Sequence, residues 1–182
     1  GMRLAAEANG GRCVFTSEID RHCRKTYAAN FAEEAEIAGD IRQVRSEDVP
    51  DHDLLAAGFP CQPFSKSGVA KRNSMGRKHG FLCETQGTLF FEIARLIDAK
   101  RPQVVLLENV KHLMHHDGGR TLETIVGTLE SMGYGVSWRL VNAAFAVPQG
   151  RERVFLLALR DGAKFDLADV RCILHSLKVE VA

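Results

Sequence analysis

Apolar runs of strand length alternate with amphipathic helical patterns along most of this chain. The intervening segments repeat apolar residues every three to four positions, as helices with one buried face do. We predict strands at 12–19, 36–41, 52–59, 103–110, 136–145 and 153–160. We predict helices at 21–31, 87–102 and 119–135, the second ended by proline and the third by glycines. This alternation is typical of an α/β fold whose mainly parallel sheet is covered by helices on both faces.

Polar or reactive side chains directly follow four of the predicted strands, namely Glu18, Asp40, Cys61 and the pair Glu108–Asn109. Ligands of such sheets bind beyond the carboxyl ends of the strands, so we expect these residues to line a site. The sequence has no Gly-x-Gly-x-x-Gly motif, which argues against a dinucleotide site. Glu18 and Asp40 could still bind an adenosine, which offers ribose hydroxyls and an amino group, although Glu18 alone could equally cap a helix.

The stretch "GFPCQPFSKSG" at 58–68 places a thiol between two prolines. Pro60 and Pro63 restrict the backbone around Cys61, a rigidity that a merely structural cysteine does not need. The strands that end near Cys61 and Glu108 are joined by one helix, so a right-handed crossover brings both residues to a common cleft. A thiolate beside a carboxylic acid suits attack on a polarisable ring such as cytosine. Sulfur would add at C6 while Glu108 protonates N3, and C5 would then accept a methyl group from a sulfonium donor.

Two arginines alternate in "PQGRERVF" at 148–155, at the entrance of the last predicted strand. Arg151 and Arg153 can therefore project to the same side. One could bind the carbonyl of the base, and the other could bind a phosphate or Glu108. The simpler interpretation is a surface strand on which the arginines pair with Glu152.

Composition is that of one soluble globular domain, with 182 residues, a hydrophobic share of 45% and a net charge of +1. No apolar stretch approaches membrane-spanning length and no signal peptide is found, so we expect a cytoplasmic protein. Five cysteines without a Cys-x-x-Cys pair fit reduced thiols, and Cys61 alone among them has a reactive setting. The histidines of "HLMHHDGG" lack an accompanying cysteine or acid cluster, so we expect no metal.

Basic residues gather at 66–80 without any acid. Charge alone favours a solvated loop. Because this stretch directly follows the Cys61 turn, Lys71 and Arg72 are candidates for contact with a phosphate backbone.

Three segments, "GFPCQPFSKSG", "LLENV" and "VPQGRERVF", resemble in this order signature motifs of the DNA (cytosine-5) methyltransferases. The resemblance extends to "TSEID" at 16–20, "GDI" at 39–41 and "GTLFFEIARLI" at 87–97, and the long insert after Gly68 is similar to the Dcm-type bacterial branch, which methylates the inner cytosine of CCWGG. It implies a Rossmann-like methyltransferase fold and methyl transfer from S-adenosylmethionine to a cytosine flipped out of double-stranded DNA. It also implies a bacterial, nucleoid-associated enzyme of a restriction–modification system.

The resemblance implies a role for each matching residue. Cys61 would be the covalent nucleophile and Glu108 the acid at N3, with Asn109 holding the proline–cysteine turn. Arg153 would contact the cytosine carbonyl, and Arg151 would support Glu108. The cofactor would lie against Glu18, Ile19, Asp40, Ile41, Pro60 and Leu89. The DNA-facing loop and its support would include Gln62, Ser65, Ser67, Lys71, Arg72 and Gln149.

The resemblance also implies a domain organisation. Residues 1–162 would be a catalytic domain whose first strand and Phe-x-Gly-x-Gly loop are expected to be missing, and 163–182 a tail toward an absent target-recognition domain. Two alternatives to a DNA methyltransferase remain: a cytosine-5 methyltransferase of tRNA, and a truncated, non-catalytic remnant that acts as a folded module. The sequence specifies neither the recognition site nor the oligomeric state.

Overall fold

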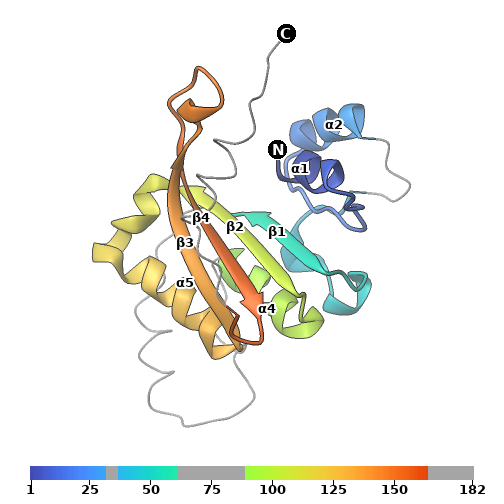
Figure 1. Cartoon of the computed structure of the whole chain (residues 1–182). Coiled ribbons are helices and arrows are strands. Elements are labelled where there is room, and N and C mark those ends of the chain that lie inside the picture. The colour runs from blue at the N-terminus through green and yellow to red at the C-terminus, as the bar shows by residue number, and fades with distance from the viewer. Residues whose placement is uncertain (32–36, 61–88, 164–182) are drawn as a thin grey trace.

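The computed structural model of this chain describes residues 1–31, 37–60 and 89–163. Its centre is a sheet of β1 (Leu54–Gly58), β2 (Val104–Val110), β3 (Tyr134–Asn142) and β4 (Glu152–Arg160), arranged in the order β1-β2-β4-β3 (Figure 1). β1 and β2 run parallel, whereas β4 is antiparallel to β2 and to β3. The α/β fold class is confirmed. The sheet in the described residues is mixed rather than mainly parallel, because β3 and β4 are consecutive antiparallel strands joined by residues 143–151.

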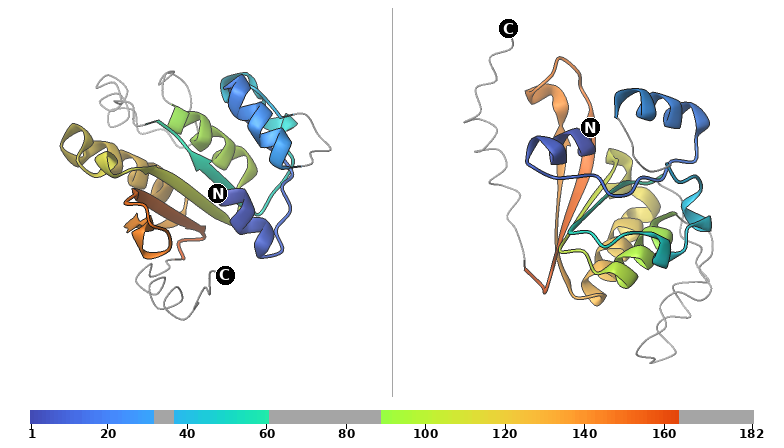
Figure 2. Two further views of the ribbon diagram at one scale, coloured as in Figure 1. Left: turned by 90° about the horizontal axis from the view of Figure 1, so that it is seen from above. Right: turned by 90° about the vertical axis from the view of Figure 1, so that its right-hand side faces the viewer.

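Two helices, α4 (Leu89–Lys100) and α5 (Arg120–Ser131), pack on one face of this sheet (Figure 2). Alternate strand residues supply the sheet side of this core, because neighbouring side chains on a strand point to opposite faces. The buried core consists mainly of Phe90, Ile93, Ile97, Val105, Leu107, Ile125, Leu129, Val136, Val154 and Leu156. The opposite face of β2 and β4 carries the half-buried side chains of Leu106, Glu108, Phe155 and Leu157. Glu108 therefore faces away from α4 and α5.

Most predicted elements are confirmed with shifted ends. The helix predicted at 21–31 is α2 (Arg21–Asn30), and the remaining predicted helices and the strands from 52 onward correspond to α4, α5 and β1–β4. The strands predicted at 12–19 and 36–41 are wrong as strands in the described residues, where they form one parallel bridge, Ser17 to Ala38. Asp20 and Asp40 cap α2 and the 3-10 turn η1 (Ile41–Gln43), so helical conformation begins directly after each of these extended segments.

The N-terminal part places α1 (Met2–Ala8) beside α2. Arg3 of α1 donates a hydrogen bond to the Tyr27 hydroxyl at 3.0 Å, and its guanidinium lies 4.1 Å from the ring centroid of Phe31. Neither helix has a buried residue. The pair is therefore held by cation–π and polar contacts rather than by a core of its own.

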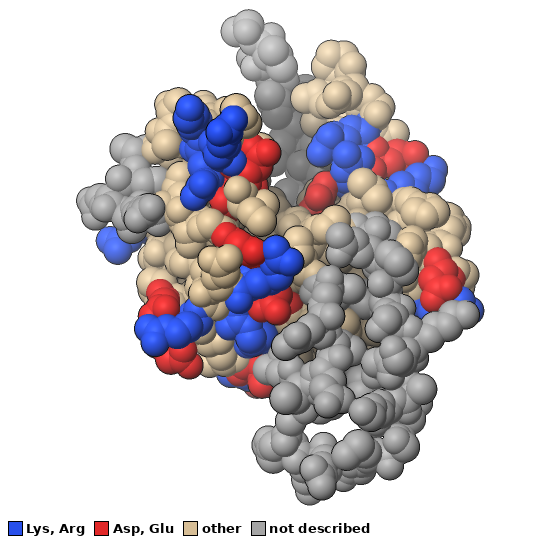
Figure 3. Space-filling view, turned by 180° about the vertical axis from the view of Figure 1, so that it is seen from behind, with Lys and Arg blue, Asp and Glu red and all other residues tan. Residues whose placement is uncertain are grey.

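Five short 3-10 segments connect these elements: η1, η2 (Ser46–Asp48), η3 (Lys111–Met114), η4 (His116–Gly119) and η5 (Ala143–Phe145). In the space-filling view from behind, positive and negative side chains of the described residues lie interspersed (Figure 3). None of the described helices has the length and apolar character needed to cross a membrane.

Candidate active site

β1 and β2 end side by side, and their parallel register pairs Gly58 with Glu108. A Cβ on Gly58 would lie 3.5 Å from Oε2 of Glu108, so any longer side chain at 58 would crowd the carboxylate. Cys61 follows Gly58 by three positions and lies outside the described residues. The crossover predicted from the sequence is thus present, with Glu108 beside the strand that leads to Cys61.

Glu108 lies beside two arginines of the hairpin, Arg151 directly before β4 and Arg153 at the start of β4. Nε of Arg153 lies 2.9 Å from Oε1 of Glu108, and Nη2 of Arg151 lies 4.0 Å from the same oxygen. Glu108 and Arg153 each keep about a quarter of their side-chain surface exposed, so this ion pair is open to a ligand. The alternation of the two arginines therefore does bring both toward one carboxylate.

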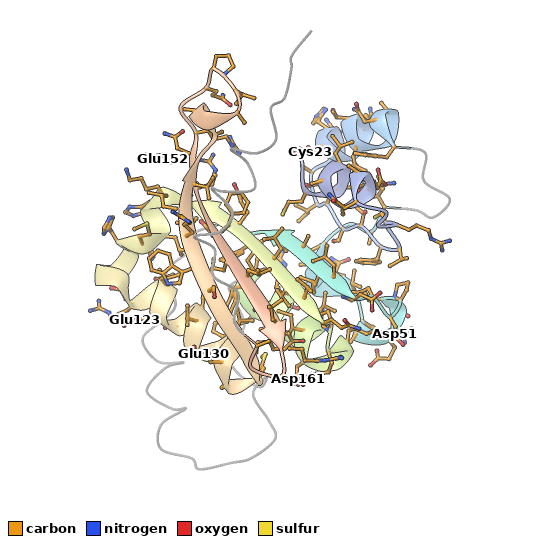
Figure 4. All side chains as sticks on the ribbon, viewed as in Figure 1. Cys23, Asp51, Glu123, Glu130, Glu152 and Asp161 are labelled. Atoms are coloured by element: carbon orange, nitrogen blue, oxygen red, sulfur yellow. The ribbon has the colours of Figure 1, made fainter. Side chains whose placement is uncertain are left out.

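Glu152, between these arginines, pairs elsewhere. Its carboxylate accepts a hydrogen bond from Nζ of Lys111 at 2.9 Å, and its backbone carbonyl accepts one from Arg153 at 2.8 Å. Figure 4 shows Glu152 near the base of the turn that joins β3 and β4. Because the Glu152 carboxylate pairs with Lys111, it does not compete with Glu108 for Arg153. The simpler interpretation, a surface strand whose arginines pair with Glu152, therefore does not describe this hairpin.

Asn109 points to the opposite side of β2 and is almost fully buried, with 2% of its surface exposed. Its Nδ2 donates to the Phe59 carbonyl at 2.8 Å, and its Oδ1 accepts from the Val110 backbone N–H at 2.8 Å. The Phe59 ring packs against Phe90, with 5.7 Å between centroids. These contacts fix the backbone immediately before Pro60, and hence the point from which the Cys61 turn departs.

Glu18 and Asp40 are brought to one end of the Ser17–Ala38 bridge. The Glu18 N–H donates to the Ala38 carbonyl at 2.9 Å, and the Ser17 hydroxyl donates to the Gly39 carbonyl at 2.7 Å. Because the two segments run parallel, the side chains that follow the bridge project from the same edge. The bridge therefore places Glu18 and Asp40 at the same end of the two paired segments.

These carboxylates suit a nucleoside, since both accept hydrogen bonds from hydroxyl or amino groups. Glu18 uses Oε1 to accept from the Asp20 N–H, which leaves Oε2 without a hydrogen bond in the described part of the chain. Between the carboxylates in sequence, Ile19 is 62% exposed and offers an uncovered apolar surface to a flat ring. The residues present therefore fit the adenosine part of S-adenosylmethionine.

Asp40 already has a partner in this structure. Arg42 forms several hydrogen bonds to its carboxylate, with Nη2 to Oδ2 at 2.6 Å, and the Arg42 backbone N–H donates to Oδ1 at 3.0 Å. The side-chain hydrogen bond from Arg42, followed by the backbone one, lowers the pKa of Asp40 below its ordinary value of 3.8. The carboxylate is thus held ionised as an acceptor.

The other predicted ligand-binding residues divide by location. Ile41 begins η1 and Leu89 begins α4, both half-buried, while Pro60 is exposed directly after β1. Gln149 lies exposed in the β3–β4 turn, and no hydrogen bond joins it to Glu108 in the described ranges. The predicted loop residues Gln62, Ser65, Ser67, Lys71 and Arg72 lie outside the described residues.

Two residues near the site had not been singled out. Asn142 accepts hydrogen bonds from the backbone of Ala144 at 3.0 Å and of Arg151 at 3.2 Å, so it closes the base of the turn that delivers Arg151. Its signal is an asparagine directly before a short helical turn, a preferred capping residue. Arg95, on α4, binds the η1 segment, and its signal is a charge between buried neighbours, Ala94 and Leu96.

The thiols in the described part have no comparable setting. Cys23 is exposed on α2, and Cys13 is half-buried. Loss of hydration, followed by the nearby Asp20 carboxylate, raises the pKa of Cys23 above its ordinary value. A raised pKa keeps the thiol protonated and weakly nucleophilic. No group of three or more histidines, cysteines or acids that could hold a metal occurs among the described residues.

The sequence model of the family described as C-5 cytosine-specific DNA methylase matches residues 1–177. The Type II methyltransferase M.DsaV of Dactylococcopsis salina is 49% identical over 162 residues, covering 88% of this chain and 43% of the relative. A DNA-cytosine methyltransferase of Escherichia coli K12 is 40% identical over 214 residues, covering 100% of this chain and 45% of the relative. This chain thus spans about half the length of the curated relatives it matches.

Among solved structures, the Dnmt2 methyltransferase of S. pombe superposes with a TM-score of 0.71 at 18% identity, covering 100% of this chain and 53% of that one. At this identity the superposition shows a shared fold.

Proposed function

Because this chain belongs to the family of C-5 cytosine-specific DNA methylases, we propose that it forms the catalytic core of an enzyme that methylates C5 of cytosine in DNA. The observation that carries the proposal is the Glu108–Arg153 ion pair at the end of β2, beside the strand end that leads to Cys61. This arrangement offers a carboxyl group and a guanidinium to one base, within reach of the segment that contains the thiol. The family implies S-adenosylmethionine as the methyl donor.

Cytosine needs activation before its C5 can accept a methyl group, and Cys61 and Glu108 would supply it. The Cys61 thiolate adds to C6 while the Glu108 carboxyl group donates a proton to N3, so the electrons of the C5–C6 double bond make C5 nucleophilic. After C5 has taken the methyl group, loss of the C5 proton to a base, expulsion of the Cys61 sulfur and return of the N3 proton to Glu108 restore the ring. Arg153 orients Glu108 through the 2.9 Å contact and can donate to the O2 carbonyl of the base.

The donor would be held by the segments that meet at the Ser17–Ala38 bridge and by residues beside the carboxyl end of β1. Glu18 would accept from the ribose hydroxyls and Asp40 from the adenine amino group, with Ile19 and Ile41 against the ring and Pro60 and Leu89 packing nearby. When bound, S-adenosylmethionine supplies the methyl group. The exposed Ile19 side chain and the second oxygen of Glu18 support this assignment, since both lack a partner in the described ranges.

Double-stranded DNA would present the base flipped out of the helix, because C6 cannot be attacked within a stacked duplex. Gln62, Ser65 and Ser67 would close over the flipped base, and Lys71 and Arg72 would meet the phosphate backbone. Gln149, in the exposed turn between β3 and β4, would support this loop from the hairpin side.

The proposal is tested by covalent trapping on duplex DNA that contains 5-fluorocytosine, with S-adenosylmethionine present. Fluorine at C5 cannot leave as a cation, so the elimination stops and the protein stays attached through sulfur. We expect a gel-stable adduct that Cys61→Ala abolishes and the matched variant Cys23→Ser retains.

Other outcomes discriminate between the proposed activity and its alternatives. An adduct only from a chain extended to the length of the relatives would mean that the core needs the remainder of the enzyme. Trapping on 5-fluorocytosine tRNA but not on DNA would assign the RNA substrate. No adduct from either chain on either nucleic acid would overturn a catalytic function.

A further inference from the structure

Arg95 places a charged group next to the buried face of α4. It lies on α4 between the buried residues Ala94 and Leu96, and its side chain is 22% exposed. A guanidinium in such a position must have its N–H groups satisfied, since burying an unpaired charge is costly. Its partners therefore show what it does.

Arg95 binds four acceptors, three of which lie on the 41–46 segment. Nη2 donates to the backbone carbonyls of Ile41 at 3.2 Å and Val44 at 2.8 Å, and Nη1 donates to the Ser46 hydroxyl at 2.8 Å. Nε donates to Glu92 on the same helix at 2.9 Å, which orients the guanidinium toward the segment. One side chain thus joins α4 to a turn about fifty residues earlier in the sequence.

The turn that Arg95 binds cannot define its own shape. η1 has three residues, and its internal backbone bonds are Gln43 N–H to Asp40 and Val44 N–H to Ile41. A single 3-10 turn is not stable in isolation, because its nucleation fixes several dihedral angles for very few bonds. The Val44 carbonyl and the Ile41 carbonyl, which also accepts the Val44 N–H, are the groups through which Arg95 can hold this turn.

Both candidate ligand-binding residues of this segment depend on the same turn. Asp40 caps η1, with its Oδ1 accepting the Arg42 N–H at 3.0 Å, and Ile41 is the first residue of η1. A shift of η1 therefore moves Asp40 and Ile41 together. Leu89 begins the helix that carries Arg95, so α4 links all three.

We propose that Arg95 is a positioning residue of the cofactor site, which holds the Asp40–Val44 turn so that Asp40 and Ile41 face the adenine end of the nucleoside. The inference rests on the proposed function. Lysine cannot replace arginine here, because one ammonium lacks the planar, forked donors that reach two carbonyls, a hydroxyl and a carboxylate at once.

The test measures binding of two probes, S-adenosylhomocysteine and 5′-deoxy-5′-methylthioadenosine, by calorimetry on the full chain. The variants are Arg95→Met, Arg95→Lys and Ser46→Ala. The matched control is Arg45→Met on the same segment, whose guanidinium pairs with Asp48 and is 74% exposed. Amide exchange at Gln43, Val44 and Asp48 reports the shape of the turn without any ligand.

Loss of a charge-assisted hydrogen-bond cluster should weaken both probes by the same factor, about tenfold for Arg95→Met and Arg95→Lys. For Ser46→Ala the loss should be about twofold to threefold, as for one neutral hydrogen bond. Exchange at 43–48 should rise in the Arg95 variants and stay unchanged in Arg45→Met. Equal losses for both probes locate the defect at the adenosine end, since methylthioadenosine lacks the amino acid part.

Several results would overturn the inference. If the wild-type chain and Arg95→Met bind both probes equally tightly, the positioning role is refuted while the proposed function stands. The same holds if Arg45→Met loses as much probe affinity as Arg95→Met. A loss for S-adenosylhomocysteine without one for methylthioadenosine refutes it as well. If Arg95→Met does not fold, Arg95→Lys and Ser46→Ala decide by the same criteria. Absence of binding by the wild-type chain refutes the proposed function, and the inference with it.

Discussion

Individual side chains at the ends of β1 and β2 act by fixing their neighbours. Gly58 leaves room beside the Glu108 carboxylate, Arg153 orients that carboxylate, and Asn109 holds the Phe59 carbonyl from the other face of β2. Successive residues 108 and 109 thus serve opposite sides of one strand: Glu108 faces Arg153, and Asn109 faces the backbone that follows β1. Each polar side chain at the end of β2 therefore has its partner on a neighbouring segment: Arg153 of β4 for Glu108, and the Phe59 carbonyl after β1 for Asn109.

Asn109→Ala should destabilise the fold, because it leaves the buried Phe59 carbonyl without its donor. The expected loss is about 1–3 kcal/mol in the free energy of unfolding. Urea unfolding measures it, with Asn30→Ala as the control, since Asn30 is exposed and bonds only to the Thr26 carbonyl of its own helix. Equal midpoints for the two variants would contradict the structural role of Asn109.

Glu108→Gln should slow adduct formation on 5-fluorocytosine DNA while leaving the fold intact. An amide keeps the shape of the carboxyl group but cannot transfer a proton to N3, and general acid catalysis is worth about 10²–10⁴-fold in rate. The rate of trapping measures the effect. Glu123→Gln, on the exposed side of α5, is the control and should trap at the wild-type rate (Figure 4).

Where a helix or strand is buried against a neighbour, its conformation matches its hydrophobic periodicity. Where no neighbour buries a segment, local capping side chains determine its conformation. α4, α5 and β2 were predicted because their apolar faces belong to the core. The 12–19 and 37–41 segments have strand-like composition but a single bridge, and there the caps of Asp20 and Asp40 decide the conformation. The composition of a segment shows that it could pair as a strand. Whether a neighbouring strand is there to pair with it depends on residues far away in the sequence.

α2 should lose its N-terminal turn in acid. The Cys23 N–H, and after it the His22 N–H, donate to the Asp20 carboxylate and lower its pKa below the ordinary value of 3.8. A lowered folded-state pKa means that the cap is fully present above pH 3.8 and is lost as the pH falls through the still lower folded value. Protection factors of the His22 and Cys23 amides should therefore be constant near neutrality and decline below about pH 4.

Asp20→Asn separates charge from capping in this experiment. Asparagine still accepts a hydrogen bond but does not titrate, so its protection should lack the acid decline. An identical decline in the variant would assign the acid effect to another group.

At the scale of the whole molecule, the sequence predicted the pairs that one connection determines and missed those that depend on distant packing. The β1–α4–β2 crossover follows from chain topology, and it brings Gly58 to Glu108. The arginine pair follows from strand alternation. The sequence marks Arg95 only as a charge between apolar neighbours. Its contact with Ile41 and Val44 could not be predicted, because these partners are more than fifty positions away and are backbone carbonyls, which every residue has.

The order β1-β2-β4-β3 puts β4, the latest of the described strands in the sequence, into the interior of the sheet. β2 and β3 therefore form no backbone hydrogen bonds with each other, and each gains its antiparallel partner only when β4 enters between them. During synthesis, a growing chain that has emerged as far as β3 carries Glu108 without either arginine. The Arg153–Glu108 contact and both antiparallel strand pairs thus form only after β4 has been synthesised, so the ion pair of the site and the closure of the described sheet arise in the same folding step.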